Sequence, residues 1–343
     1  MEREFYLDLA AAGLRMPIGA HLVLHEHKAP EEIMKDGRQL GEVVAEAARR
    51  FRVPLAVPLM DLKLEKTALL LAHDIAEADT ESYHFSEPPL FARLVALTPR
   101  MIATCDGINH IARETSLVPV GMGIGPFSLT TKLIADPITP VFLAGAGATA
   151  AEEREVRLIE SVLVLATRVV LQYVEAQVAA GAKAIIICEP AANQVFFSPN
   201  QLARSYAVFD HFVMEPNRRI KELLIAHGAD LIFHNCGELL DGMVRRFASL
   251  DPAILSLGSS RKLWQDAALV PPATVLYGNL PTKKFYSDAL LSRADVKRLT
   301  LDLIQRMHSV GHPFILGSEC DVLSVPGCER TITSKVEEFL QCQ

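Results

Sequence analysis

Three residues in the second half of the chain have the types and the spacing of a metal site. His234 and Cys236 are separated by one residue, and Cys320 lies far downstream. Side chains two positions apart in an extended chain point to the same side, so His234 and Cys236 could bind one ion together. Zinc accepts imidazole nitrogen and thiolate sulfur in tetrahedral geometry, and a catalytic zinc keeps one position for water or substrate. These residues predict a zinc site with three protein ligands.

Each of the three residues also has an ordinary structural explanation. A cysteine at the end of a strand usually packs against its neighbours, and a histidine at such a place usually makes a structural hydrogen bond. A His-x-Cys pair with one distant cysteine is also less specific for metal than paired CxxC motifs. The conjunction of the three residues, more than any one of them, therefore favours zinc.

Two further polar residues are candidates for a catalytic role. Glu189 follows a strongly apolar run, and we expect it to be a weak fourth metal ligand that an incoming substrate displaces, or a hydrogen-bond partner of that substrate. Asn279 follows another apolar run, and we expect it to position the substrate. His234 and Cys320 also come soon after apolar runs, so the fold should bring all four residues to one end of a sheet.

The apolar runs that precede these polar residues predict the fold. Most of them are separated by segments with helical periodicity, which is the alternation expected of a parallel sheet. The sequence therefore predicts an α/β protein: a (β/α)8 TIM barrel with an N-terminal helical extension, forming a single domain over residues 1–343. In this fold the carboxyl ends of the strands carry the active site. The runs expected as strands are 18–24, 55–60, 118–124, 184–188, 231–233, 254–257, 274–277 and 314–316.

Other polar residues near the first two runs are second choices for the site. His21, His25 and His27 share one face if their segment is a strand, so they either line the barrel rim or face solvent. Asp61 and Glu65 follow the second run and could orient a substrate at the barrel mouth. A helix N-cap followed by a carboxylate in the first turn explains Asp61 and Glu65 equally well.

Four segments, in the right order along the chain, carry a resemblance to a known family. Residues 125–129 (GPFSL) resemble that family's GPFTLA, 233–237 (FHNCG) its HxCG, 277–280 (YGNL) its GN(I/L)D, and 317–321 (GSECD) its SGC(D/E). The chain thus resembles the uroporphyrinogen decarboxylase superfamily, and within it the cobalamin-dependent methyltransferase branch typified by methylcobalamin:coenzyme M methyltransferases.

The resemblance implies both a fold and a reaction. It implies a (β/α)8 barrel that holds zinc through the residues matching His234, Cys236 and Cys320, with a carboxylate at the position of Glu189 in some members. The implied reaction moves a methyl group between a methyl-corrinoid and a small thiol or another methyl donor or acceptor. The chain has no cobalamin-binding DxHxxG segment, so we expect a separate corrinoid protein to present the cobalamin.

Two alternatives to the methyltransferase remain open. The decarboxylase branch holds its carboxylated tetrapyrrole with an arginine-rich segment near the N-terminus, whereas residues 19–32 here contain no arginine. Buried carboxylates without cationic partners would cost several kcal/mol each, so a decarboxylase is the weaker alternative. Residues 322–327 also lack the family's usual PPxTP ending, and the histidine cluster is not a family feature. A non-catalytic protein that binds zinc or a corrinoid is the other alternative, because fold does not settle function.

Composition restricts the partners and the compartment. The formal net charge of −7 gives no overall basic field for nucleic acid or an anionic membrane. The N-terminus lacks the apolar core of a secretory signal, and no stretch offers about 20 uncharged apolar residues for a membrane span. The six cysteines are spread along a long chain, which favours reduced thiols. We expect a cytoplasmic enzyme that acts on small molecules, with a homodimer allowed.

Overall fold

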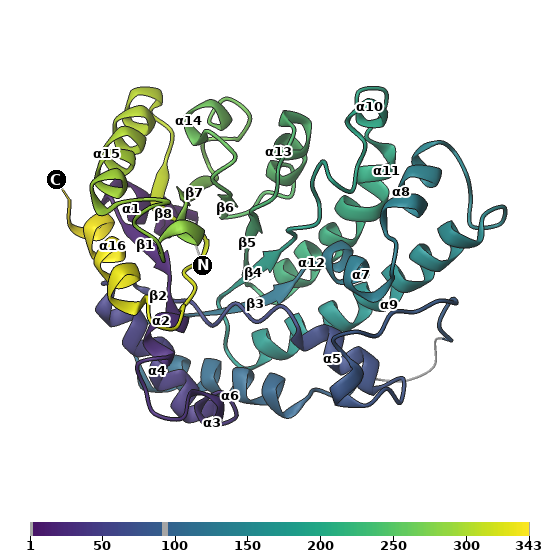
Figure 1. The fold of residues 1–343 in the computed structure, drawn as a ribbon, viewed down its shortest axis with the longest axis horizontal. Helices are drawn as coiled ribbons and strands as arrows, with labels where there is room; N and C mark the ends of the chain where they lie inside the picture. Colours follow the sequence, from purple (N-terminus) through teal and green to yellow (C-terminus); the bar gives the residue numbers. More distant parts are fainter. Residues whose placement is uncertain (1–2, 91–94, 343) are drawn as a thin grey trace.

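The chain forms one curled sheet of eight parallel strands with helices between successive strands (Figure 1). The computed structural model describes residues 3–90 and 95–342. The order of the strands in the sheet is β1-β8-β7-β6-β5-β4-β3-β2. The strands are β1 (Arg15–Ile18), β2 (Leu55–Ala56), β3 (Val118–Ile124), β4 (Ala184–Cys188), β5 (Asp230–Asn235), β6 (Ile254–Leu257), β7 (Val275–Leu280) and β8 (Phe314–Asp321).

Local sequence signals define several of the helices. The helix α15 begins at a capping box, in which Ser292 and Asp295 bond to each other's main-chain N–H groups. The helix α6 begins at Thr98, whose hydroxyl accepts a bond from the N–H of Met101. The helices are α1 (Arg3–Ala11), α2 (Ala20–Leu24), α3 (Pro30–Ile33), α4 (Gly37–Arg50), α5 (Leu64–Leu71), α6 (Pro99–Glu114), α7 (Pro126–Leu133), α8 (Ile138–Gly145), α9 (Arg154–Ala179), α10 (Pro199–Leu202), α11 (Ala207–Phe209), α12 (Glu215–Ala226), α13 (Asp241–Ala248), α14 (Leu263–Asp266), α15 (Arg293–Val310) and α16 (Glu329–Gln341), with the short turns η1 (Glu77–Asp79), η2 (Asp210–Met214) and η3 (Thr282–Lys284).

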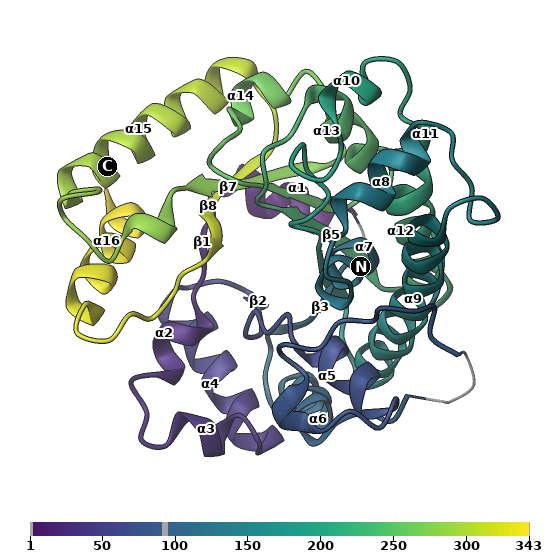
Figure 2. The same ribbon diagram turned by 45° about the vertical axis from the view of Figure 1, so that its right-hand side comes forward.

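The sheet curls around an interior but is not closed by main-chain bonds. Parallel pairing joins each strand to the next from β2 round to β8, and β8 also pairs with β1. Across 3–90 and 95–342, no pairing joins β1 to β2, so these two strands are the edges of the sheet (Figure 2). The predicted α/β arrangement of eight parallel strands with intervening helices is therefore confirmed, with a seam between β1 and β2.

Alternation along the strands divides the apolar core into two layers. On β4, Ile186 and Cys188 belong to the cluster inside the curled sheet, whereas Ile185 and Ile187 pack in the layer beneath the helices. All eight strands contribute side chains to the inner cluster. Because successive side chains point to opposite faces of a strand, the inward or outward direction of each polar residue at a strand end is already fixed.

Tyr277 links three strands inside the barrel. Its hydroxyl donates to the carbonyl oxygen of Met16 at 2.8 Å and lies 3.1 Å from the hydroxyl of Ser318. The ring needs a glycine beside it, since a Cβ at Gly317 would come within 2.3 Å of a ring carbon. The fully buried ring thus fixes β7 against β8 and β1.

The helix α1, which precedes β1, covers the amino-terminal end of the barrel. Its Tyr6 is fully buried and donates from its hydroxyl to Asp230 at 2.9 Å, at the first residue of β5. Arg3 donates to the carbonyl oxygen of Pro252 at 2.5 Å and forms a 2.8 Å ion pair with Asp251, just before β6. Both contacts are at the starts of strands, so α1 lies at the opposite end from the residues expected to do chemistry.

The prediction for the first strand is wrong. Residues 18–24 were expected to be extended, but β1 is Arg15–Ile18 and residues Ala20–Leu24 form the helix α2. A short, continuously apolar run fits a buried helix as well as a buried strand, and periodicity does not separate the two. Leu22, Val23 and Leu24 are buried, which accounts for the apolar run. As a result, His21, His25 and His27 do not share a strand face.

The helix α9 is the single helix in the described part of the chain that is long and apolar enough to cross a membrane. In the structure, 56% of its most apolar stretch is buried, and it packs against α5, α7, α12 and β3. A core helix of a folded domain meets the same length and composition criteria. The apolar character of α9 is thus explained by packing.

Replacing Tyr6 by phenylalanine should destabilise the fold, because the change removes one bond to a carboxylate at the end of the barrel. We expect the free energy of unfolding to fall by about 1–2 kcal/mol in urea denaturation. The matched control is Tyr286→Phe, in which the side chain is exposed and the change should stay within about 0.5 kcal/mol. Equal effects of the two substitutions would contradict the role given to Tyr6.

Candidate metal centre

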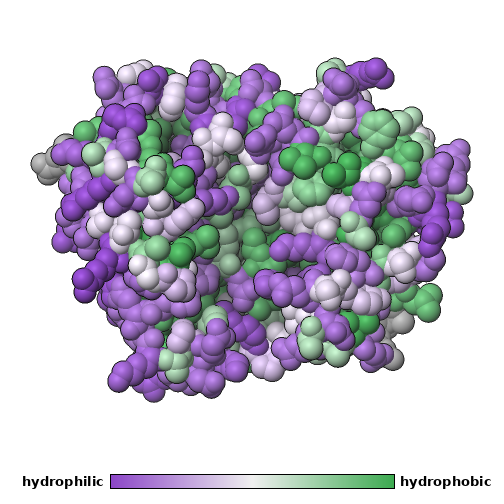
Figure 3. Space-filling model, in the orientation of Figure 1, coloured by the Kyte–Doolittle hydropathy of each residue, from purple (hydrophilic) through white to green (hydrophobic). Residues whose placement is uncertain are grey.

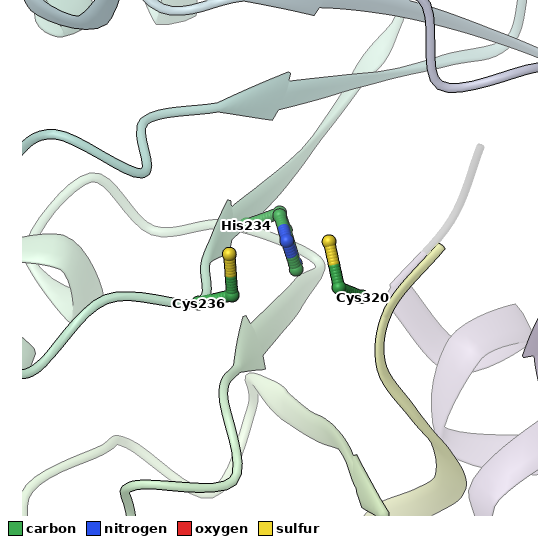
Figure 4. A group of neighbouring side chains, drawn as sticks. All are labelled: His234, Cys236 and Cys320. Carbon is green, nitrogen blue, oxygen red and sulfur yellow. The ribbon is translucent and has the colours of Figure 1, made fainter. Parts of the chain in front are cut away.

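His234, Cys236 and Cys320 lie together at the carboxyl-terminal end of the barrel (Figure 4). One ligand atom from each residue lies within 4.8 Å of the ligand atoms of the other two. His234 is in β5, Cys236 follows β5 directly, and Cys320 is in β8. His234 is buried and the two cysteines are partly buried. We call these three residues the HCC cluster.

The period of two along β5 brings His234 and Cys236 to the same side. Phe233 packs outward in the layer beneath the helices. Asn235 also points outward, where its amide donates to the carbonyl oxygens of Glu189 at 2.5 Å and Ala192 at 3.0 Å. His234 and Cys236 therefore face the barrel interior, as the spacing predicts.

The two ring nitrogens of His234 have different surroundings. Nδ1 lies 2.7 Å from the hydroxyl oxygen of Ser256 on the neighbouring strand β6. Nε2 is buried and has no hydrogen-bond partner among the residues that the structure describes. Histidine metal ligands usually have a partner on the second nitrogen, which sets the ring orientation and the tautomer. A buried Nε2 beside two thiols is therefore suited to hold a metal ion.

The two thiols of the HCC cluster have pKa values that are shifted in opposite directions. A hydrogen bond from Cys320 and the proximity of His234 lower the pKa of Cys236 well below its usual value, even though burial opposes this. The same interaction and burial raise the pKa of Cys320. Lys283, from the turn η3, adds positive charge beside both sulfur atoms. One thiolate is thus already favoured, and thiolate is the form that binds zinc.

The structure does not bring Glu189 into the HCC cluster. Cys188 points into the barrel, so the next side chain points out. Both carboxylate oxygens of Glu189 are engaged there: Oε1 accepts from the N–H of Phe127 and the amide of Asn217, and Oε2 accepts from the N–H and hydroxyl of Ser128. The role of Glu189 as a fourth ligand stays a prediction that this geometry does not favour.

Glu189 fastens the start of α7 to the end of β4. Its approach requires Gly125, since a Cβ there would lie 2.0 Å from the carboxyl carbon of Glu189. Burial raises the pKa of the fully buried Glu189, and its bonds to Ser128 and Asn217 act in the opposite direction. The arrangement explains why a glycine precedes Pro126 and why a carboxylate is tolerated here.

Asn279 lies at the same end of the barrel, on β7. Its amide donates to the carbonyl oxygens of Gly258 at 2.8 Å and Arg261 at 2.9 Å. These bonds hold the loop that follows β6, where Ser259 also bonds to Glu319 of β8 at 2.5 Å. The contacts place Asn279 as a support for the rim, and its predicted role in positioning substrate stays a prediction.

One of the three N-terminal histidines reaches the rim near the HCC cluster. Nδ1 of His21 lies 2.5 Å from Oδ2 of Asp321, the residue after Cys320. Burial lowers the pKa of His21, but the bond to Asp321 and its charge outweigh this and raise it. His25 stacks on His21 with ring centroids 6.4 Å apart, whereas His27 lies 3.0 Å from Glu46 away from the rim.

Asp61 is not the N-cap of α5, because Lys63 occupies that position. Asp61 and Glu65 therefore make separate contacts. Asp61 accepts from the N–H of Lys63 at 3.3 Å and forms a 3.7 Å ion pair with Arg100. Glu65 is in the first turn of α5, fully buried, and accepts from the N–H of Ile124 at 3.1 Å. Burial raises the pKa of Glu65 to about 8.

Several residues around the HCC cluster were not anticipated from the sequence. Ser256 was missed, although a polar residue inside the apolar run 254–257 was a visible signal. Asp321 lies in the segment 317–321, and the sequence alone assigns it no separate role. Met60, whose sulfur lies 3.7 Å from that of Cys320, and Lys283 come from distant parts of the chain, and nothing local marks them.

Known proteins resemble this chain in sequence family and in fold. The family model described as Uroporphyrinogen decarboxylase (URO-D) matches residues 20–328. Among solved structures, a methyltransferase from Methanosarcina mazei covers 98% of this chain with 98% of its own, at a TM-score of 0.65 and 15% sequence identity. At that identity the likeness shows the fold. None of the curated proteins compared matches the chain.

Removing either thiol of the HCC cluster should release zinc. We expect protein purified without added metal to contain near-stoichiometric zinc by elemental mass spectrometry, and we expect Cys236→Ser and Cys320→Ser to lose most of it, because each loses a thiolate ligand. The control is Cys328→Ser, a partly buried cysteine outside the cluster. A wild type that is free of zinc and takes up none would contradict the assignment.

Changing Glu189 to glutamine should affect stability rather than metal content. The glutamine amide would point a donor at groups that are themselves donors, so we expect the free energy of unfolding to fall by about 2 kcal/mol or more. Zinc content measured by mass spectrometry should stay near the wild-type value. The matched control is the exposed Glu238→Gln. Loss of zinc from a folded Glu189→Gln protein would instead make Glu189 a ligand.

Proposed function

The chain belongs to the uroporphyrinogen decarboxylase (URO-D) family, and from this premise we propose that it is a zinc-dependent corrinoid methyltransferase. The observation that carries the proposal is the HCC cluster, with its buried and unpartnered Nε2 of His234 beside two thiols. The fold that the chain shares with the Methanosarcina mazei methyltransferase supports the same proposal. The substrates are a small thiol, or another methyl donor or acceptor, and a methyl-corrinoid.

In this proposal His234, Cys236 and Cys320 hold the zinc ion, and Ser256 orients the imidazole. When bound, zinc would supply a Lewis acid that favours the thiolate form of a small thiol near neutral pH. The donor set of one imidazole and two thiolates suits zinc better than magnesium or calcium, which prefer oxygen ligands. The sulfur of Met60 lies 3.7 Å from that of Cys320 and covers part of this partly buried side chain.

The residues around the HCC cluster would bind and orient the thiol. Asn279 and Glu319 fasten the loops after β6 to the rim, so that the site keeps its shape when substrate enters. The imidazole of His21, held by Asp321, is a polar group at the same rim that could accept the proton of the thiol. Lys283 adds a positive charge next to the sulfur atoms, which favours an anionic sulfur substrate.

The corrinoid would be presented by a separate protein. The described face of the molecule has a hollow near its centre, with apolar side chains visible at its base (Figure 3). A thiolate sulfur would form a bond to the methyl carbon of a docked methyl-corrinoid while the carbon–cobalt bond breaks and its electron pair stays on the cobalt. The reverse transfer would start from a methylated substrate and a corrinoid that carries this electron pair. The chain itself contributes the thiol-binding half of the reaction.

A uroporphyrinogen-decarboxylase-like reaction is the second candidate, favoured by the description of the matched family model. This reaction would need cationic side chains to hold the substrate carboxylates. Residues 19–32, which follow β1 and include α2 and most of α3, contain one lysine, Lys28, and no arginine. A non-catalytic zinc or corrinoid carrier is the third. Of the three, methyl transfer makes the most use of a buried imidazole next to two thiols.

The test is thiol-dependent demethylation of methylcobalamin, followed by the change in its visible absorbance, with a panel of small thiols. We expect turnover in the wild type and a loss of about 100-fold or more in His234→Ala, because an imidazole ligand is removed. Cys328→Ser is again the control. Zinc-loaded protein that is inert with every thiol, yet binds a corrinoid protein, would favour the carrier. Metal-independent release of carbon dioxide from a porphyrinogen would favour the decarboxylase.

A further inference from the structure

A second cavity, of about 350 Å³, lies outside the HCC cluster. Its walls come from the start of α5, the end of α7 and the segment around η1. Three of its lining residues are lysines, Lys63, Lys66 and Lys132, and two are acidic, Glu77 and Glu81. The segments α5 and α7 follow β2 and β3 along the chain.

The acidic residues of this cavity leave two of the lysines without a carboxylate partner. Glu81 pairs with Lys63 at 2.9 Å. Lys66 is buried, and its ammonium group donates to the main-chain carbonyl oxygen of Glu81 at 2.9 Å, which is a neutral acceptor. Lys132 is half-buried and forms no ion pair within the described ranges. Two ammonium groups therefore line one cavity without a direct ion pair among the described residues, and the charge of Glu81 offsets theirs in part.

Electrostatic repulsion between these lysines is only partly compensated by the neighbouring carboxylates. Burial, and then the charge of Lys132, lowers the pKa of Lys66, and burial, followed by the charge of Lys63, lowers the pKa of Lys132. Burial raises the pKa of the nearby carboxyl of Glu65 to about 8, and its charge acts on the pKa of Lys132 in the opposite direction to the charge of Lys63. An anion bound between the lysines would reduce the repulsion.

We propose that this cavity binds an oxyanion, namely the phosphate, sulfate or carboxylate group of a small molecule. Lysine ammonium groups are donors suited to such groups. A volume of about 350 Å³ falls within the range of small-molecule sites, so the cavity holds more than a bare ion. The proposal goes beyond methyl transfer and does not depend on it.

The experiment is isothermal titration with inorganic phosphate at constant ionic strength, on the full chain as purified. We expect wild type and Lys132→Arg to bind phosphate, and Lys132→Gln to bind it about tenfold more weakly, because one charged donor is lost. The matched control is Lys297→Gln, an exposed lysine on α15, which should bind as the wild type does. Absence of phosphate binding to the wild type, or equal binding by Lys132→Gln, overturns the proposal.

Two further measurements complete the test. Circular dichroism and thermal melting show whether Lys132→Gln is folded, and Lys63→Gln, at a more exposed position, provides a second variant for which weaker phosphate binding is expected. Competition then identifies the source of the oxyanion. If phosphate raises the KM of an anionic thiol but not of a neutral thiol, the oxyanion is part of the substrate. If neither KM changes while phosphate still binds, the cavity serves a separate ligand. Binding is measured without turnover, so a failed methyl-transfer assay leaves this result independent.

Discussion

The alternation of side chains at the carboxyl end of β5 is the constraint on which the site depends. Phe233 and Asn235 point out toward the helices, and His234 and Cys236 point in. Because strand pairing sets Cys188 opposite His234, the same alternation turns Glu189 outward. A shift of one residue in the register of β5 would exchange the two sets and turn both His234 and Cys236 away from the interior.

Four carboxylates connect neighbouring elements at the carboxyl-terminal rim of the barrel. Glu65 bonds to the end of β3, Glu189 to the start of α7, Glu319 to the loop after β6, and Asp321 to His21 on α2. Each one joins an element to a neighbour that is distant in sequence. A buried carboxylate is costly to leave without its partner, so each contact strongly specifies the position of the element that it joins. The rim is thereby built before any ligand arrives.

Much of the fold could be predicted from the sequence, because it follows from local patterns. The strands β3, β4 and β6 have the bounds that their apolar runs predict, 118–124, 184–188 and 254–257. The first strand was misplaced because an apolar run describes burial and not backbone conformation. The convergence of His234 with Cys320 also follows from strand order alone. The direction of Glu189 depends on the register between β4 and β5, which single-strand patterns do not contain, and the partners Ser256 and Met60 depend on contacts across the barrel.

Because the sheet is open between β1 and β2, a metal ion in the HCC cluster would also add a cross-link between strands. Around the sheet, β5 and β8 are connected only through the ladders of β6 and β7. Across the interior, however, His234 and Cys320 approach each other directly, and an ion bound by both would cross-link β5 to β8. Binding of a metal ion by the HCC cluster would then affect the curvature of the sheet, and the curvature would affect the binding. The ion would therefore join β5 to β8 directly, whereas β1 and β2 are held at the seam by packed side chains and not by a ladder of the described strands.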